Sequence, residues 1–233
     1  MTAYTYSTIV TALASEMVVP TTDDNFIAIL PTILSNAELR LQRDLDLIDS
    51  TVRDSSTTFT LSTRNFTLPS SLGTFIVVDQ MNVITPQGTS DPESGTRNPL
   101  TQVSIDTLDA LWPSSTGSTV PTYYAMMNQD LAIVGPFPDQ AYTVEVVGTA
   151  RFATLSTAVA TNPLSVFFPD MYIAAALVEG AAYQRNFGAM SDDPKMALSW
   201  EAHYQALLKS AQTEENRKKF LLGHNEPAAA SRG

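Results

Sequence analysis

Cysteine is absent from the 233 residues of this chain, and only two histidines, His203 and His224, are present. The lack of thiols excludes disulfides, thiolate nucleophiles and thiolate metal sites, and two isolated histidines predict no metal cluster. The chain also lacks the short motifs of zinc proteases, serine hydrolases, phosphate-binding loops and dinucleotide-binding folds. We therefore predict no metal and no cofactor, and we interpret His203 as a residue on a helix face.

Long apolar runs are missing as well. The longest, Met171–Val178, is far short of the roughly 20 residues that a membrane-spanning helix needs. The N-terminal segment has no basic residues ahead of an apolar stretch, so we expect no secretory signal peptide. With 44% hydrophobic residues and a mean hydropathy of −0.01, the composition is typical of a soluble globular protein without membrane contact.

Basic residues are scarce, since 13 Lys and Arg stand against 24 Asp and Glu, which gives a net charge of −11. The deficit is greatest from Asp54 to Asp170, where ten acidic residues face three arginines. Nucleic-acid grooves need clustered Lys and Arg, so this region is not expected to bind DNA, and solubility is the first interpretation of its charge. Basic residues gather instead near the C-terminus, at Arg217, Lys218 and Lys219.

Carboxylates are the remaining enzymatic signal, since two acids at the right separation can hydrolyse a glycosidic bond. Three close pairs have structural explanations as a turn, a polar helix face and a helix start, where acids complement the helix dipole: Asp23 with Asp24, Asp44 with Asp46, and Asp192 with Asp193. A pair assembled from distant residues, such as Asp79 with Asp130 or Glu145, stays open as an alternative. We predict that the protein is not an enzyme.

Zones of different composition divide the chain. They are a helical zone at 1–55, a strand-rich zone at 56–155, a second helical zone at 156–223 and a flexible tail at 224–233. In the first zone, Tyr6–Met17 is one predicted helix. Apolar residues then recur every three or four positions from Phe26 to Ile48, which predicts a second helix. Pro31 lies inside this pattern, so that helix is predicted to begin or bend there.

The strand-rich zone changes its period to two. Thr58–Leu61 and Asn65–Leu68 alternate polar and apolar residues as half-buried strands do, and Phe75–Ile84 is typical of a more buried strand. The other elements that we predict are loops at 86–99 and 113–121, a helical turn over Ser104–Leu111, and strands at 122–127, 131–134 and 142–152. Short antiparallel strands joined by polar turns predict a β-sandwich or barrel.

The two helices of the last zone differ in pattern. The helix from about Pro169 is apolar on nearly every side, so other helices or subunits must enclose it. The next helix is predicted to start at Asp193 and Pro194, which supply an N-cap and a first-turn proline. It carries one apolar stripe, in which Trp200 and Tyr204 lie one turn apart.

A two-helix unit at either end of the chain could not bury its own apolar surface, so we expect the two helical zones to pack together. The predicted fold is α+β: a helical bundle formed by the N- and C-terminal helices, with an antiparallel β-sandwich or barrel inserted between them. The residues predicted to pack in the helical core are Ile33, Ala37, Leu41, Leu45, Ile173, Leu177, Trp200 and Tyr204.

The basic run near the C-terminus ends in an apolar triplet, Phe220-Leu221-Leu222. One interpretation is a solvated helix C-terminus, where cations complement the dipole. The other is a docking segment, in which the basic residues steer a partner and the triplet anchors in its groove. Both interpretations stay open, although the triplet would otherwise be exposed at the end of a polar helix.

Several local patterns follow one another in the order found in one known family. They are Ala37–Leu45 (AELRLQRDL), Asn65–Pro69 (NFTLP), Pro121–Ala125 (PTYYA) with Leu131–Asp139 (LAIVGPFPD), and Leu155–Asp170, which contains TNPL and FPD. Together they resemble the head-to-tail adaptor family of short-tailed bacteriophages, also called tail tubular protein A or head-completion connector. The resemblance covers nearly the whole chain.

The resemblance implies a structural protein of the virion neck, assembled in the host cytoplasm. It implies a ring, commonly of twelve copies, that joins the portal protein to the tail nozzle or tail tube, with tail fibres as further candidate partners. DNA would cross the ring during ejection without specific binding. A C-terminal extension is implied to reach the portal, so the candidate portal or subunit interface consists of Arg217, Lys218, Lys219, Phe220, Leu221, Leu222 and His224.

The alternative is a tail-associated binding module for fibre attachment or receptor binding. It is motivated by the turn-rich loops at 86–99 and 113–121, because binding residues concentrate on loops.

Overall fold

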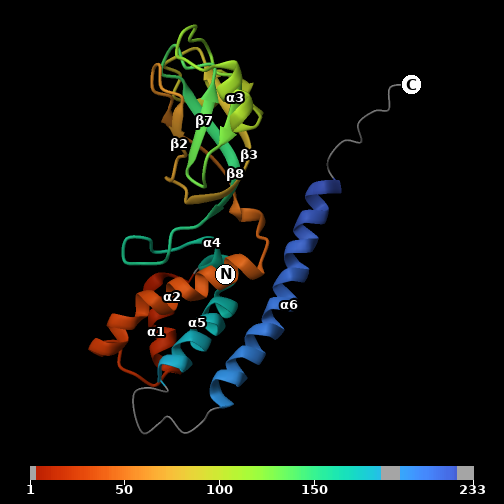
Figure 1. Cartoon of the computed structure of the whole chain (residues 1–233). Coiled ribbons are helices and arrows are strands. Elements are labelled where there is room, and N and C mark those ends of the chain that lie inside the picture. The colour runs from red at the N-terminus through yellow and green to blue at the C-terminus, as the bar shows by residue number, and fades with distance from the viewer. Residues whose placement is uncertain (1–3, 185–194, 225–233) are drawn as a thin grey trace. The chain divides into compact units, whose positions relative to one another are not determined.

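The computed structural model describes residues 4–184 and 195–224. Its helices and strands make a mixed α+β protein, which confirms the predicted fold class (Figure 1). The chain divides into two compact units: Met1–Asp49 with Ala153–Gly233, which we call the helical unit, and Ser50–Phe152, which we call the β unit. The chain therefore leaves the helical unit once, completes the β unit and returns.

The helical unit is arranged around one apolar helix. Its helices are α1 (Tyr6–Glu16), α2 (Asp24–Asp44), α4 (Pro163–Phe167), α5 (Pro169–Gln184) and α6 (Lys195–His224), and η1 (Ile48–Ser50) follows α2. Helix α5 contacts α1, α2, α4 and α6, and Tyr172, Ala175 and Ala176 on it are fully buried. Its neighbours in the same chain thus enclose the helix that is apolar on nearly every side.

Polar side chains begin the first two helices. Thr5 caps α1 by accepting a hydrogen bond from Thr8 N, and Asp23 caps α2 by accepting from Phe26 N at 2.8 Å. Helix α2 then extends over Asp24–Asp44 with Pro31 inside it. Of the two predicted alternatives, a helix start or a bend at Pro31, the start is therefore excluded. Pro31 is exposed, so its ring faces solvent, where the missing backbone hydrogen bond is least costly.

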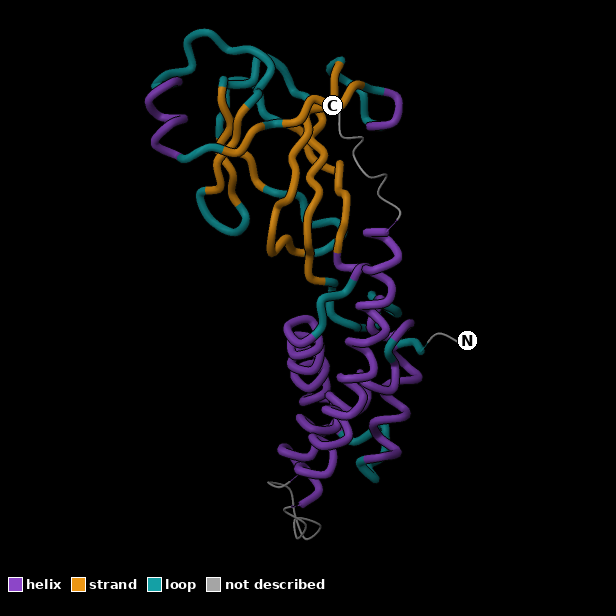
Figure 2. Tube along the Cα trace, turned by 90° about the vertical axis from the view of Figure 1, so that its right-hand side faces the viewer, coloured by secondary structure: helices purple, strands orange, loops and turns teal. Residues whose placement is uncertain are grey.

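The β unit contains two four-stranded sheets. Its strands are β1 (Thr51–Thr58), β2 (Asn65–Thr67), β3 (Thr74–Thr85), β4 (Thr96–Pro99), β5 (Thr101–Gln102), β6 (Tyr123–Met126), β7 (Leu131–Gly135) and β8 (Thr143–Arg151). One sheet has the order β1-β8-β3-β4 and the other β2-β7-β6-β5, as Figure 2 shows by their separate groups of strands. Residues of both sheets, among them Met81, Val144, Tyr124 and Val134, form one apolar core.

A short helix, α3 (Ile105–Leu111), covers part of the second sheet. Its buried Leu108 packs against Ala125 of β6 and Ile133 of β7, and Trp112 lies at the edge of this cluster. Ser104 caps the helix by accepting from Thr107 N, in agreement with the helical turn predicted over Ser104–Leu111. The β unit thus consists of two packed sheets, and α3 packs on the second sheet.

Several details of the predicted strands are wrong. Residues 51–55 belong to β1 and not to the first helical zone, because this edge strand pairs with the end of β8 at Thr51↔Thr149. The predicted loop at 86–99 contains η2 (Pro92–Ser94) and β4, since Thr96–Pro99 pairs with the end of β3. Strands β5 and β6 pair in parallel, so the sheets are not purely antiparallel. Strand β1 ends at Thr58, so only the first residue of the predicted strand Thr58–Leu61 belongs to a strand.

Helix α6 differs from its prediction mainly at its ends. The predicted N-cap Asp193 and Pro194 lie outside the described residues. At the other end α6 continues to His224, so residue 224 is helical, and the rest of the predicted tail, 225–233, lies outside the described residues. Of the helices in the described ranges, none has both the length and the apolar character that a membrane crossing requires.

Candidate interaction surface

A row of polar contacts holds α6 against the C-terminal half of α2. Arg40 Nη2 lies 2.5 Å from Glu201 Oε1, and the Arg40 guanidinium lies 4.1 Å from the centre of the buried Tyr204 ring. Tyr204 donates its hydroxyl proton to Asp44 Oδ2 at 2.6 Å. Burial raises the pKa of this hydroxyl, and Asp44 raises it further, so Tyr204 stays a donor at any ordinary pH. The row therefore fixes the rotation of α6 about its own axis.

Farther along α6, Glu215 ties the helix to the segment that follows α2. Its carboxyl is buried; Oε2 accepts from Ile48 N at 3.0 Å, and Oε1 accepts from Lys218 Nζ at 2.7 Å. Gln212 Nε2 donates to the Asp44 carbonyl at 3.2 Å. Backbone groups on both sides of residue 46 are thus hydrogen-bonded to side chains of α6.

Two residues of the basic run take part in this fastening. Lys218 lies over the rings of Phe167 and Phe168, with its Nζ 5.6 and 5.1 Å from their centres. Burial lowers the pKa of Lys218, but ion pairs with its two neighbouring glutamates outweigh that effect and raise it. Lys219 forms an ion pair with Asp46. These two cations stabilise the helical unit itself.

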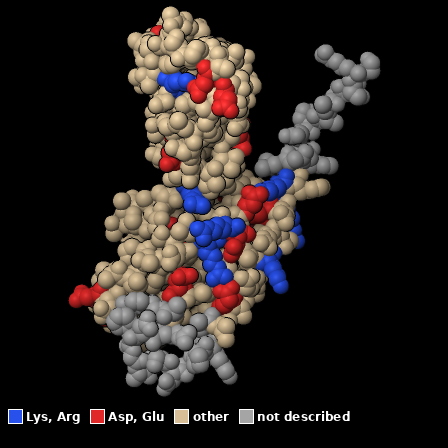
Figure 3. Space-filling view, in the orientation of Figure 1, with Lys and Arg blue, Asp and Glu red and all other residues tan. Residues whose placement is uncertain are grey.

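The rest of the candidate interface remains exposed. Phe220 and Leu221 are 69% and 64% exposed, and Arg217 is exposed beside them. Leu222 and His224 belong to the last turn of α6, but their side chains lie outside the described residues. Figure 3 shows basic side chains distributed along the visible side of α6. Of the predicted interface, Arg217, Phe220 and Leu221 are the described residues that a partner could contact.

The residues predicted to pack in the helical core lie in two environments. Six of them are buried: Ile33, Ala37, Leu41, Leu45, Leu177 and Tyr204. Ile173 and Trp200 are partly exposed. Among the residues of α6 whose side chains are described, Tyr204, Leu208, Ala211 and Glu215 are buried, so the buried stripe includes a charged residue, and Trp200 of the predicted stripe is only partly covered.

A second buried glutamate, Glu38 of α2, holds the segment that precedes α4. Its Oε1 accepts three hydrogen bonds, from Leu155 N at 3.0 Å, Asn162 Nδ2 at 2.9 Å and Tyr172 OH at 3.0 Å. Oε2 is buried and has no hydrogen-bond partner among the described residues. Burial raises the pKa of Glu38 in spite of these donors. Glu38 and Glu215 therefore each fasten one of the two segments by which the chain leaves and re-enters the helical unit.

Sequence reasoning missed the roles of both glutamates, although a signal was present. Glu38 lies four residues after the buried Leu34, and Glu215 lies four residues after the buried Ala211, so each occupies an apolar-face position of its helix. A charged residue at such a position must have partners in the fold, because an unpaired buried charge is costly. The pattern could have marked them as anchors.

The acids of the enzymatic alternative lie in different environments. Glu145 is buried in β8 and accepts hydrogen bonds from Asn82 at 2.9 Å and from Arg97 Nε at 3.0 Å. Burial acts to raise the pKa of Glu145, but these bonds outweigh it and lower the pKa. Asp79 and Asp130 are exposed. A carboxylate held ionised by several donors is a structural group, and it is unsuited to proton transfer at neutral pH.

His203, which we interpreted from the sequence as a residue on a helix face, belongs to α6. His203 is exposed, and its ring centre lies 6.0 Å from that of Trp200 in an edge-on arrangement. No group of three or more His, Asp or Glu side chains that could hold a metal ion occurs within the part of the chain that the structure describes.

Replacing Glu215 by Ala should lower the unfolding free energy of the helical unit by about 2 kcal/mol, because a buried carboxylate that accepts from Ile48 N and Lys218 is lost. Urea unfolding, followed by fluorescence in a Trp112→Phe background, measures the helical unit through Trp200. Glu214 is the matched control, since it is exposed and its ion pair among the described residues is with Lys218. Its replacement by Ala should cost less than about 0.5 kcal/mol, and equal losses for the two variants would contradict the anchoring role.

A comparison with known families decides what kind of protein these units form. The model of one family, described as SU10 adaptor protein, matches residues 4–224. The chain belongs to the SU10 adaptor protein family. No curated protein matches the chain. The match includes both units and ends at the last residue of α6, so the exposed end of that helix is part of the family pattern.

Membership establishes the general nature of the protein and confirms the predicted phage adaptor family. The adaptor is a structural protein of a phage and a component of its virion. Adaptors work by binding other structural proteins of the phage, such as those of the portal and the tail. This role requires surfaces, and the exposed residues of α6 are the first candidates.

Proposed function

We propose that this adaptor forms a ring, of twelve copies by the family resemblance, that joins the portal protein to the tail nozzle or tail tube. The end of α6 is the observation that carries the proposal. Phe220 and Leu221 are exposed, although in the preceding turn Lys218 contacts the Phe167 and Phe168 rings and Lys219 pairs with Asp46. Two exposed apolar side chains on a helix that is held in place can serve as a docking point for a partner, because binding buries them.

The charge of the chain supports a passage that DNA crosses without binding. The β unit has nine acidic residues and four arginines, and Arg53, Arg64 and Arg97 form ion pairs within the unit. Tight phosphate binding needs several uncommitted cations close together. The β unit therefore offers DNA few free cations, which is consistent with a passage that DNA crosses without binding.

Size-exclusion chromatography with light scattering tests the ring directly. The full chain is measured alone and then with the portal protein of the same phage. We expect a species of about the mass of a closed ring bound to the portal, and the chain alone can remain smaller, since subunit contacts and portal contacts reinforce each other. Failure to bind the portal, together with virions whose necks lack a ring of this chain, would sink the proposal.

Replacing both Phe220 and Leu221 by Ser should prevent the chain from assembling as a ring on the portal and leave the melting temperature unchanged, because both side chains are largely exposed in the helical unit. Co-sedimentation with the portal and thermal unfolding measure the two effects. Leu198→Ser is the matched control, since Leu198 is equally exposed on the same helix, near its other end. It should bind normally; a variant with both serines that still binds would place the docking point elsewhere.

The tail-associated binding module makes a different prediction for a phage that lacks the gene. Loss of adsorption with normal head and tail joining would favour that alternative. Particles with filled heads and no attached tail favour the adaptor ring. Micrographs of the mutant particles distinguish the two.

A further inference from the structure

An acid-rimmed apolar surface lies at the turn between α1 and α2. Val18 and Ile27 are 80% and 51% exposed there, and Glu16 and Asp24 are exposed beside them. Neither acid forms a salt bridge with any residue in the described ranges. The chain has no Lys or Arg before Arg40. We call Glu16, Val18, Asp24 and Ile27 the acidic turn.

Val18 is unusual within this surface because its backbone is in the left-handed region, with φ of 56°. A β-branched residue avoids this region, and glycine is the usual choice where a helix ends this way. The turn closes α1 with hydrogen bonds from Val18 N to Ser15 O and from Val19 N to Ala14 O. Valine occupies this position although most of its side chain is in solvent. Local strain at an exposed apolar residue points to a role outside the fold of one chain.

A complementary surface lies on the C-terminal part of α6, from Lys209 onward. Lys209, Arg217 and Phe220 are exposed, and their spacing of eight and eleven residues places them on one side of the helix. Leu221 adjoins them. Within the described residues, neither Lys209 nor Arg217 is in a salt bridge. We call Lys209, Arg217, Phe220 and Leu221 the basic face.

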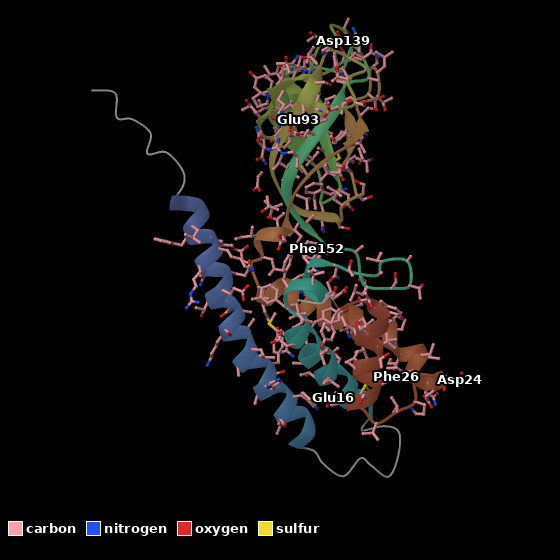
Figure 4. All side chains as sticks on the ribbon, turned by 180° about the vertical axis from the view of Figure 1, so that it is seen from behind. Glu16, Asp24, Phe26, Glu93, Asp139 and Phe152 are labelled. Atoms are coloured by element: carbon pink, nitrogen blue, oxygen red, sulfur yellow. The ribbon has the colours of Figure 1, made fainter. Side chains whose placement is uncertain are left out.

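The two surfaces lie on different sides of the helical unit. Figure 4 labels Glu16 and Asp24 on the side away from the C-terminal end of α6, and Figure 1 shows the same separation from the opposite direction. A ring with head-to-tail contacts needs this arrangement, because each subunit presents one surface to the neighbour on its left and a different one to the neighbour on its right. The two surfaces also match in chemistry, since each has apolar side chains and they carry opposite charges.

We propose that the acidic turn of one copy docks on the basic face of the next copy. The inference rests on the proposed ring and specifies its subunit contact. Val18 and Ile27 meet Phe220 and Leu221 at the centre of this contact, and Glu16 and Asp24 face Lys209 and Arg217 at its rim. Burial of the apolar side chains supplies affinity, and the charges set the order in which copies join.

Disulfide trapping tests the contact, and the absence of native cysteine makes it clean. The full chain carrying Val18→Cys and Leu221→Cys replaces the native protein in phage particles, which are then oxidised and run on a non-reducing gel. We expect a ladder of covalent multimers, because each copy is linked to two neighbours. Either single cysteine variant is the control and should give dimers at most. Absence of the ladder from particles whose necks contain the ring would overturn the contact.

Val18→Gly separates assembly from folding. Glycine relieves the strained backbone and removes the apolar side chain, so the melting temperature should be unchanged or higher while the chain enters particles at least about tenfold less efficiently. Equal incorporation would overturn the contact. A charge exchange adds a rescue: Glu16→Lys and Arg217→Glu should each reduce incorporation, and the double variant should restore it. Cross-links from the Leu221→Cys variant to a different virion protein would assign the basic face to that partner and also overturn the inference.

These outcomes distinguish a failure of the inferred subunit contact from a failure of the proposed function. A ring in micrographs without a ladder on the gel leaves the adaptor ring standing and removes this subunit contact. Virions with no ring of this chain remove the proposed function itself.

Discussion

Replacing Glu38 by Ala is expected to lower the unfolding free energy of the helical unit by about 3 kcal/mol. Leu155 N, Asn162 Nδ2 and Tyr172 OH all donate to Glu38 Oε1. Each buried donor left without an acceptor costs about 1–3 kcal/mol, and removal of a buried charge returns part of that cost. In a Trp112→Phe background, Trp200 is the only tryptophan, so its fluorescence during urea unfolding reports on the helical unit alone.

Glu38→Gln is the matched control, because its amide oxygen can accept the same three hydrogen bonds without a charge. Its new amide group, however, would lie where Oε2 has no hydrogen-bond partner among the described residues, so a smaller loss, about 1 kcal/mol, is expected. A Gln variant as unstable as the Ala variant would show that the charge, and not the accepted hydrogen bonds, is what the helical unit needs.

The pH dependence of the Gln variant tests the buried charge separately. Burial raises the pKa of Glu38 above its ordinary value of 4.5, so the folded unit binds this proton more tightly than the unfolded chain does. The contribution of Glu38 to stability is therefore fully present below about pH 4.5 and is lost as the pH rises through the folded pKa. The unfolding free energy of the native unit, measured relative to Glu38→Gln, should fall from acid to neutral pH. A flat difference would show that the pKa is not raised.

The sequence was most informative where the pattern was long and regular. The spacing from Phe26 to Leu45 placed α2, and the apolar run Met171–Val178 placed α5 at the centre of its neighbours. These patterns survive because burial of one side of a helix repeats at every turn. At Pro31 the alternative of a helix start was excluded, because the local rule was outweighed by the packing of the residues around it, such as Leu30 and Ile33.

The polar partners could not be predicted in the same way. Lys218 and Lys219 form a basic run in the sequence, which is as typical of a docking segment as of an anchored one. Their partners include Asp46, which precedes the whole β unit in the chain. Spacing along a helix identifies which side a residue occupies, but it does not identify which distant side chain comes to face it. In the fold, therefore, fewer residues of the candidate interface are available to a partner.

Short strands were missed for a related reason. Strand β4 has Arg97, Asn98 and Pro99 among its four residues, and nothing in their propensities favours a strand. It forms because β3, which pairs with β8 along one edge, offers its other edge at Asn82–Thr85. Likewise β5 pairs in parallel with β6 because the chain returns through α3 before the second strand begins. Such strands are decided by tertiary contacts.

The β unit contains the second large effect, at Gly148. This residue lies in β8, the strand between β1 and β3, where it is paired with Val78 beside an irregularity of β3. A Cβ at Gly148 would lie 2.1 Å from the Val77 carbonyl oxygen and 3.0 Å from the Val78 Cα. Both atoms belong to the main chain of β3, so no side-chain rotation can make room, and the strands would have to separate.

Gly148→Ala is therefore expected to lower the unfolding free energy of the β unit by about 3 kcal/mol, at the upper end of the usual cost of overpacking. In a Trp200→Phe background, Trp112 is the only tryptophan, and its fluorescence during urea unfolding measures the β unit. Gly88→Ala is the control: its φ of 83° is strained for alanine, but nothing lies within 4 Å of the added Cβ, so it should cost about 1 kcal/mol. Similar losses at the two positions would mean that backbone conformation, and not the close approach of β3 to β8, requires glycine at residue 148.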